Sequence, residues 1–143
     1  MISVKEILQM KGNDVWTIEA DQTVFAALQQ LAEKNIGALV VTRADRVVGI
    51  LSERDYARKV ILEGKSSKET PVHQIMSQKV IGVSPESTTE ECMAIMTEHR
   101  IRHLPVFDGP DLVGVISIGD VVKAIISNQE ILIDHLVNYI TGR

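Results

Sequence analysis

The chain of 143 residues contains the same sequence pattern twice. Residues 47–55 (VVGILSERD) return as residues 112–120 (LVGVISIGD), 65 positions later. The same offset holds without a gap from residue 15 to residue 62, and residues 4–8 match residues 72–76 at an offset of 68. Self-similarity at a fixed period indicates two copies of one supersecondary unit. Halves of about 65 residues are marginally stable alone, so we expect the copies to share a core.

Each copy is predicted to form a short helical segment and then strand, helix, strand, strand and helix. Helical spacing of apolar residues and alternating apolar runs define these elements. In the second copy Thr70 is expected to cap the helical segment, with Pro71 at its first position. The order predicts an α+β fold, with a small sheet covered by helices. The expected elements are residues 4–8, 15–18, 23–35, 38–42 and 47–51, then 72–76, 80–83, 88–100, 103–107 and 112–116, with further helices from Ser52 and Ser117.

The domain boundaries follow from the repeat. The first copy is expected over residues 3–62, a linker over 63–71, the second copy over 72–127 and a C-terminal helical extension over 128–143. The extension carries an apolar stripe without a counterpart in the first copy, and such a stripe needs a partner. We expect it to pair with a second protomer and make a homodimer. Folding back over its own domain is the alternative.

Composition excludes several classes of function. A net charge of −4 argues against binding nucleic acid. No apolar run approaches the ~20 residues of a membrane span, and the first residues do not resemble a signal peptide, so a cytoplasmic protein is expected. The single cysteine, Cys92, lies on an apolar helix face and is expected in the core. The histidines lack metal-ligand spacing, so no metal site is expected.

Both copies carry Ser-x-x-Asp where a strand leads into a helix, at Ser52 with Asp55 and at Ser117 with Asp120. One interpretation is a capping box, in which the two side chains only satisfy the first helical amides. The other is a ligand site, because the pair recurs with Gly three residues before Ser, and Gly inside a strand often marks close approach. A helix N-terminus can bind phosphate, and an Asp one turn in can accept both hydroxyls of a ribose. These features suggest an adenosine nucleotide.

These motifs, in this order, resemble a tandem pair of CBS domains (the cystathionine β-synthase type), the arrangement called a Bateman module. The resemblance covers nearly all of residues 3–127 and rests on residues 49–55 and 114–120, with the strand starts at 36–39 and 100–106. It implies two β-α-β-β-α repeats packed as a pseudo-twofold pair. It also implies a non-catalytic module that binds AMP, ADP, ATP or a related adenosyl compound, NAD and S-adenosylmethionine included, between the copies.

The resemblance also implies roles for individual residues. Asp55 and Asp120 would hold ribose, and Ser52 and Ser117 would face ribose and phosphate. Strand-start positions would line the base, and basic residues there would reach phosphate. The implied base-lining residues are Trp16, Ile36, Gly37, Ile81, Ile101 and Arg102, and the implied phosphate contacts are Arg102 and His103.

The two copies differ in charge near the expected phosphates. Arg54 falls in the first turn of its helix, where a cation opposes the helix dipole, and a bound anion would explain that placement. Arg58 is expected on the same helix face at i,i+4, unless it is only a solvated surface charge. The second copy has Gly119 and Lys123 at these positions. Two sites of different affinity are therefore predicted.

Three functions remain open from the sequence. The first is an adenosine-nucleotide sensor, not an enzyme, that acts through its dimer geometry or on an effector protein that the sequence does not identify. The second is a nucleotide hydrolase with Glu53 or Asp55 as base, although the second copy has Ile118 in place of Glu53 and no Walker-type loop is present. The third is a ligand-free assembly module in which the Ser-Asp pairs only cap helices.

Overall fold

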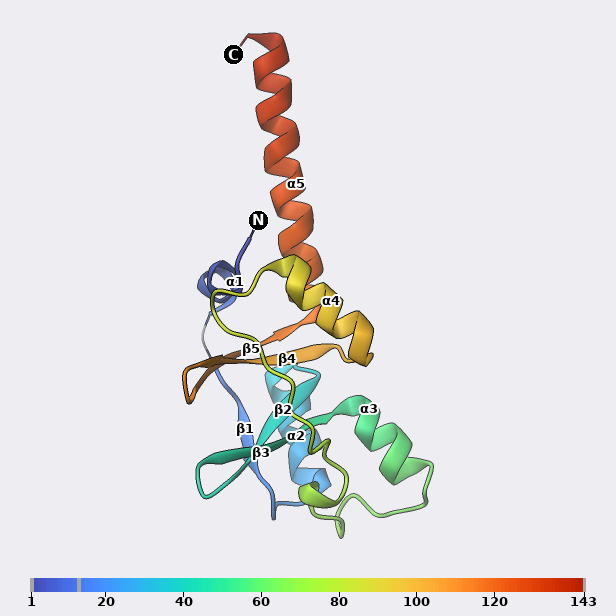
Figure 1. Cartoon of the computed structure of the whole chain (residues 1–143). Coiled ribbons are helices and arrows are strands. Elements are labelled where there is room, and N and C mark those ends of the chain that lie inside the picture. Colours follow the sequence, from blue (N-terminus) through green and yellow to red (C-terminus); the bar gives the residue numbers. More distant parts are fainter. Residues whose placement is uncertain (1, 13, 143) are drawn as a thin grey trace. The chain divides into compact units, whose positions relative to one another are not determined.

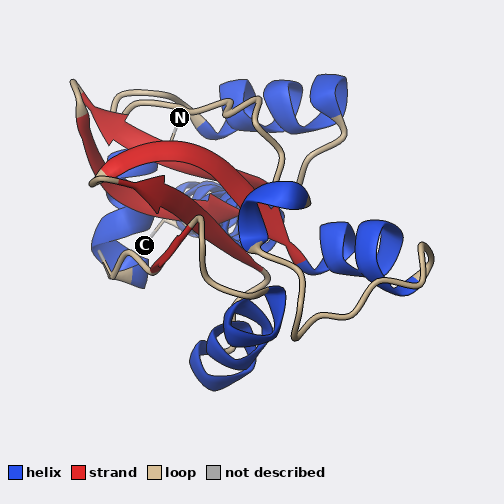
Figure 2. Cartoon of the chain, turned by 90° about the horizontal axis from the view of Figure 1, so that it is seen from below, coloured by secondary structure: helices blue, strands red, loops and turns tan. Residues whose placement is uncertain are grey.

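The computed structural model describes residues 2–12 and 14–142 and divides the chain into two compact units. Trp16–Val80 form one, here called the continuous unit. Met1–Val15 together with Ile81–Arg143 form the other, here called the split unit. Each unit combines helices with a small sheet, as Figure 1 and Figure 2 show. The predicted α+β class is confirmed.

The continuous unit is built on a three-stranded sheet in the order β1-β2-β3. Strand β1 runs parallel to β2, and β2 forms an antiparallel hairpin with β3. The chain leaves β3 through one helical turn, α3, and then a π-helical segment, η1. The elements are β1 (Thr17–Glu19), α2 (Val24–Lys34), β2 (Ala38–Arg43), β3 (Arg46–Ser52), α3 (Glu53–Tyr56), η1 (Ala57–Ile61) and the 3-10 turn η2 (Val72–Gln74).

The split unit contains an antiparallel hairpin of β4 and β5 with three helices. Helix α1 comes from the start of the chain, and the others follow the hairpin order of the second copy. The elements are α1 (Val4–Lys11), α4 (Thr89–His99), β4 (His103–Asp108), β5 (Asp111–Ser117) and α5 (Ile118–Thr141).

The predicted helices at 23–35 and 88–100 and both hairpins are confirmed with bounds within one residue, and the predicted helical segment at 4–8 extends three residues further, to Lys11. Thr23 and Thr88 cap α2 and α4 by accepting hydrogen bonds from the amides of Ala26 and Glu91. Threonine hydroxyls suit this position because they satisfy an amide that has no partner within the helix. Both residues of the β2–β3 turn, Ala44 and Asp45, have positive φ, as tight hairpin turns of the primed type require.

The predicted strand at 80–83 is wrong, since only Val83 forms an isolated parallel bridge, to Val106. The reason is the loss of two amide donors. In the continuous unit the amide of Ala20 donates to the carbonyl of Thr42, and the equivalent residue in the second copy is Pro85. Pro105 likewise stands where β2 has Val40. Proline has no N–H, so the parallel ladder shrinks to one bridge.

The predicted helix at 72–76 is also wrong in its length and its cap. The segment forms only the 3-10 turn η2, whose capping residue is Pro71, without a side-chain hydrogen bond. The hydroxyl of Thr70 instead donates to the carbonyl of Ser66 at 2.7 Å. The first copy's segment, in contrast, forms the full helix α1, with a capping box between Ser3 and Glu6.

The compact units differ from the sequence repeats by an exchange of these leading segments. Val72 and Ile75 are buried in the core of the continuous unit, and Val4, Ile7 and Leu8 in the core of the split unit. Equivalent backbone hydrogen bonds anchor the two segments. The amide of Val72 donates to Gln22 and that of Val4 to Ser87, each at 2.8 Å. Each repeat therefore completes its core with the leading segment of the other.

The glycine inside each hairpin makes room for the exchanged segment, not for a ligand as the sequence suggested. A Cβ on Gly49 would lie 2.8 Å from the backbone oxygen of Ser77, and one on Gly114 would lie 2.7 Å from Cδ2 of Leu8. Ser77 cannot retreat, because it exchanges two backbone hydrogen bonds with Ile50.

We therefore predict that Gly49→Ala is the more destabilising of two matched changes. A loss of about 1–3 kcal/mol in the free energy of unfolding is expected from overpacking. Gly114→Ala meets only the end of a side chain and should lose less. Urea denaturation of both variants measures the difference. Equal losses, or the reverse order, would contradict this account of the two glycines.

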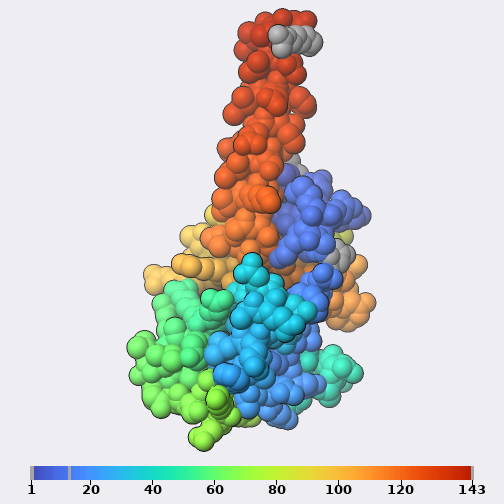
Figure 3. Space-filling view, turned by 180° about the vertical axis from the view of Figure 1, so that it is seen from behind, coloured from blue at the N-terminus to red at the C-terminus, as the bar shows by residue number. Residues whose placement is uncertain are grey.

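Helix α5 continues well past the buried part of its unit. Val121 and Ala124 are buried, whereas every described residue from 128 to 142 is exposed. Figure 3 shows the last turns, in red, standing clear of the atoms drawn around the helix's first turns. The predicted C-terminal helical extension and its stop at Gly142 are confirmed, and the helix does not fold back over its own unit.

Candidate functional site

The candidate site residues of the continuous unit lie at the same end of its strands. Trp16 precedes β1, Gly37 precedes β2, and Ser52 ends β3, which runs in the opposite direction. Ser52 lies near Gly37, whose carbonyl accepts a hydrogen bond from the amide of Glu53 at 3.1 Å. Trp16 lies two strands away from Ser52, because β2 separates β1 from β3.

Ser52 and Asp55 form a complete capping box. Oγ of Ser52 accepts from the amide of Asp55 at 3.2 Å, and Oδ2 of Asp55 accepts from the amide of Ser52 at 3.0 Å. The other carboxylate oxygen lies 3.3 Å from Nζ of Lys59, one turn further along the chain. The carboxylate is thus fixed in position and already paired with a cation.

The two large base-lining candidates of this unit, Trp16 and Ile36, pack partly against other side chains. Trp16 and Ile36 are half-buried against the core. Nζ of Lys34 lies 4.1 Å from the centre of the Trp16 ring, a cation–π distance. One face of the indole is therefore covered by a side chain of α2.

Arg54 and Arg58 are both exposed. They stand four residues apart across the change from α-helical to π-helical hydrogen bonding at Ala57, as Asp55 and Lys59 do, and that pair still meets at 3.3 Å. The amide of Leu62 donates to the carbonyl of Ala57, five residues back.

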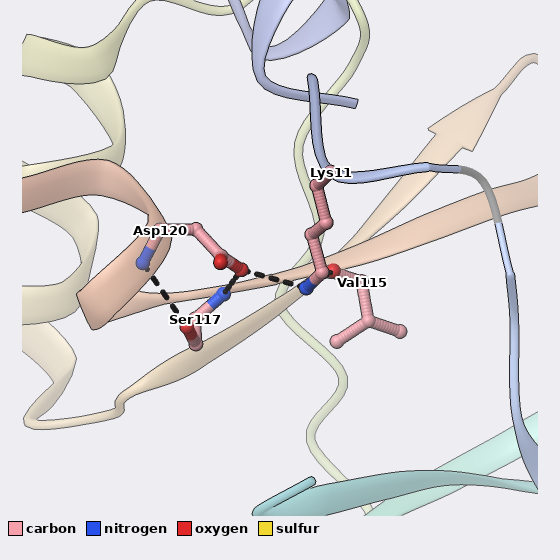
Figure 4. Close-up of polar contacts among 4 residues, drawn as sticks. All are labelled: Lys11, Val115, Ser117 and Asp120. Carbon is pink, nitrogen blue, oxygen red and sulfur yellow. Dashed lines mark hydrogen bonds and ion pairs between the residues drawn. The ribbon is translucent and has the colours of Figure 1, made fainter. Parts of the chain in front are cut away.

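The split unit repeats the capping box, with a different cation. Oγ of Ser117 accepts from the amide of Asp120 at 3.2 Å, and Oδ2 of Asp120 accepts from the amide of Ser117 at 2.8 Å. Nζ of Lys11 donates to the same Oδ2 at 2.6 Å and to the carbonyl oxygen of Val115 at 2.7 Å (Figure 4). The cation therefore comes from α1, not from the helix that carries the carboxylate.

Electrostatics fixes the charge states in this second site. Burial raises the pKa of Asp120, but the hydrogen bonds from Lys11 and Ser117 outweigh it, and the pKa is held below its ordinary value. Burial, and then the charge of Lys11, lower the pKa of His103, against the opposing effect of Asp120. Asp120 is therefore ionised near pH 7. His103 is mostly neutral there and can offer phosphate a neutral N–H donor but little positive charge.

The remaining candidates of the split unit divide between surface and core. His103 pairs directly with Ser117 across the hairpin, and Arg102 is exposed while its carbonyl accepts from the amide of Ile118 at 2.8 Å. Ile81 and Ile101 are half-buried and pack against the core. The hairpin therefore brings Arg102 and His103 to the Ser117–Asp120 pair.

Cys92 is fully buried, as predicted, and burial, followed by the charges of Glu91 and Glu90, raises the pKa of its thiol to about 11. The thiol is therefore protonated at neutral pH and is not a reactive nucleophile.

Sequence reasoning missed both lysines. Lys59 could have been found, because it follows Asp55 at i,i+4. Lys11 carries a weaker signal, its match at an offset of 68 with Lys79. No local pattern places Lys11 beside Asp120, because the two residues are 109 positions apart.

The described part of the chain offers neither a metal-binding cluster nor a membrane-spanning helix. Within residues 2–12 and 14–142, no group of three or more His, Cys, Asp or Glu side chains could hold a metal ion. Among the helices of the same residues, none is long and apolar enough to cross a membrane.

Comparison with known proteins identifies the family. The family model for the CBS domain matches the chain twice, over residues 4–62 and 72–127. The chain therefore belongs to the CBS-domain family, as a tandem pair. It is 37% identical to the mitochondrial CBS domain-containing protein CBSX3 of Arabidopsis thaliana over 98% of this chain and 72% of the relative.

Solved structures agree with this assignment. A protein with CBS domains from Burkholderia ambifaria superposes with a TM-score of 0.86 at 50% identity, covering 90% of this chain and 96% of its own. The CBS domain pair of protein MJ0100, solved with 5′-methylthioadenosine and S-adenosyl-L-methionine, superposes with a TM-score of 0.79 at 22% identity, covering 90% of this chain and 98% of its own. At that identity the second likeness shows the fold alone.

Proposed function

We propose that this CBS pair is a non-catalytic regulatory module that binds an adenosine nucleotide. The observation that carries the proposal is the doubled Ser-x-x-Asp constellation. In each unit an ionisable carboxylate is held at a helix N-terminus, beside the start of a neighbouring strand. A carboxylate held in place accepts hydroxyl donors without further ordering, and the positive end of the helix dipole favours an anion.

The individual roles remain those implied by the family resemblance. Asp55 and Asp120 would accept the ribose hydroxyls, and Ser52 and Ser117 would face ribose and phosphate. Arg54, Arg58, Arg102 and His103 would contribute to phosphate binding, with His103 as a neutral donor. The proposed base-lining residues are Trp16, Ile36, Gly37, Ile81, Ile101 and Arg102. The complex of the MJ0100 pair supports only that a CBS pair can hold adenosyl compounds.

We further propose that the protein acts as a homodimer in which α5 contributes to the subunit contact. The described extension from residue 128 to 142 carries apolar side chains that are about half exposed or more, on helical turns beyond the core. A second copy is the partner that requires no other protein, and it presents the same apolar stripe. A ligand-dependent change in dimer geometry, or in contact with an effector protein, would be the output.

A ligand-free assembly module is the second candidate, and one observation favours it. Both capping boxes are complete, so the helix N-termini are satisfied without a ligand. Hydrolysis is the weaker alternative. Asp55 is already engaged by Ser52 and Lys59. The other candidate base, Glu53, has no counterpart in the second copy, where Ile118 takes its place.

A thermal-shift titration tests the nucleotide proposal. A ligand that binds only the folded chain should stabilise it by ~2.7 kcal/mol at a hundredfold excess over its dissociation constant. We therefore expect the melting temperature to rise with AMP, ADP, ATP or NAD. If none of these raises it at millimolar concentration, the nucleotide proposal is wrong. Release of phosphate or nucleoside from the bound nucleotide would instead favour hydrolysis.

A further inference from the structure

Lys11 is a feature of the second site that the Ser-x-x-Asp motif does not account for. It is the last residue of α1, and its ammonium group bridges the carbonyl of Val115 in β5 and the carboxylate of Asp120 in α5 (Figure 4). Figure 3 shows α1, in dark blue, against the first turns of α5. The side chain of Lys11 is 36% exposed and that of Asp120 is 25% exposed, so the ion pair is partly shielded from water.

The equivalent place in the first site is built differently. There the carbonyl of Ile50, the counterpart of Val115, accepts from the backbone amide of Ser77 at 2.9 Å. Lys79 matches Lys11 in sequence and both are exposed, but within the described residues Lys79 makes no ion pair with Asp55. Asp55 takes its cation from Lys59, in the helical segment that follows its own. A lysine delivered to the carboxylate by a separate element is therefore particular to the second site.

This arrangement has a consequence for any ligand that uses Asp120. A ribose diol offers two hydroxyl donors, and Lys11 already occupies Oδ2. When the diol takes the carboxylate, Lys11 loses part of a charge-assisted hydrogen bond. A phosphate on the same ligand gives the ammonium a new anion within reach of its flexible side chain. An uncharged nucleoside gives none, and a sulfonium adds a like charge.

We propose that Lys11 is a specificity-determining residue of the Asp120 site. It neutralises Asp120 before binding and transfers to the phosphate of the ligand, so that the site selects an anionic adenosine nucleotide over uncharged or cationic adenosyl compounds. This inference rests on the proposed function, because it requires Asp120 to take the ribose.

The test is a calorimetric titration of AMP, adenosine and S-adenosylmethionine into the full chain. An Asp55→Asn background weakens the first site, so that binding at the second dominates the titration. In that background Lys11→Met should lower the ratio of AMP affinity to adenosine affinity by about tenfold or more, the value of a hydrogen bond to a charged group. Lys11→Arg, which keeps the charge, should retain most of the ratio.

Lys79→Met is the matched control, since it removes the same charge from the equivalent sequence position in the other repeat. It should leave the ratio unchanged. Melting curves establish that each variant is folded, and Lys11→Gln replaces Lys11→Met should the latter not melt cooperatively. An unchanged ratio in the Lys11 variant, or an equal fall with Lys79→Met, overturns the inference while leaving the proposed function in place. If neither AMP nor adenosine binds the chain with Lys11 intact, the proposed function fails, and the inference with it.

Discussion

Asp120→Asn is expected to weaken nucleotide binding at the second site by roughly 10- to 150-fold, and Asp55→Asn to do the same at the first. The physical reason is the loss of charge-assisted hydrogen bonds to the ribose, about 1.5–3 kcal/mol. Asparagine keeps a side-chain oxygen that can still accept from the amide of Ser52 or Ser117, so the helix cap is largely preserved. Calorimetric titration with AMP, beside a melting curve for each variant, separates binding from stability.

The Ser3–Glu6 capping box of α1 provides the matched control for this prediction. It is the same motif at a helix N-terminus of the split unit, and no ligand role is proposed for it. Glu6→Gln should therefore cost at most about 1 kcal/mol of stability and leave AMP affinity unchanged. Should the Asp variants behave in this way too, losing stability while binding nucleotide normally, both pairs are only caps.

Leu136→Lys is expected to convert a dimer of this chain into a monomer. Ile133, Leu136, Val137 and Ile140 form one stripe of α5, and each is about half exposed or more. Burying such side chains against a second copy can contribute up to ~1.5–3 kcal/mol each, and a charge in the centre of the stripe removes that gain. Sedimentation velocity over a concentration series measures the change.

Asn138→Lys is the control for this second prediction, because it adds the same charge to the opposite side of the helix, two residues away. It should leave the dimer intact. A chain ending at Ser127, which retains the buried Val121 and Ala124, should also be monomeric. If the natural chain itself sediments as a monomer, the dimer proposal is wrong. If the shortened chain remains a dimer, the contact lies elsewhere.

Local patterns predicted much of this fold because the determinants lie close together in the sequence. Thr23 and Thr88 marked helix starts, and alternating apolar residues marked both hairpins. The failures arose where a partner decides the outcome. Residues 80–83 have a strand-like composition, but Pro85 and Pro105 remove donors from the ladder. Checking the paired positions for proline would have corrected that prediction.

The candidate site was predictable in its carboxylates but not in its cations. Ser52, Asp55, Ser117 and Asp120 were identified because the motif is contiguous and doubled, and the structure places each pair in a capping box. Lys11 reaches Asp120 only because α1 packs in the split unit, and that packing depends on apolar contacts across most of the chain length. From the sequence alone, such a leading segment is assigned to the repeat that follows it.

The exchange of leading segments also orders the events of protein synthesis. Every residue of the continuous unit lies between Trp16 and Val80, so its core can close while the second half of the chain is still being made. The apolar side chains of α1 have no such opportunity. They are synthesised before the continuous unit, yet the residues that bury them, among them Leu104 and Val121, are synthesised after it. Helix α1 therefore stays without the residues that bury it until the second half of the pair has been made.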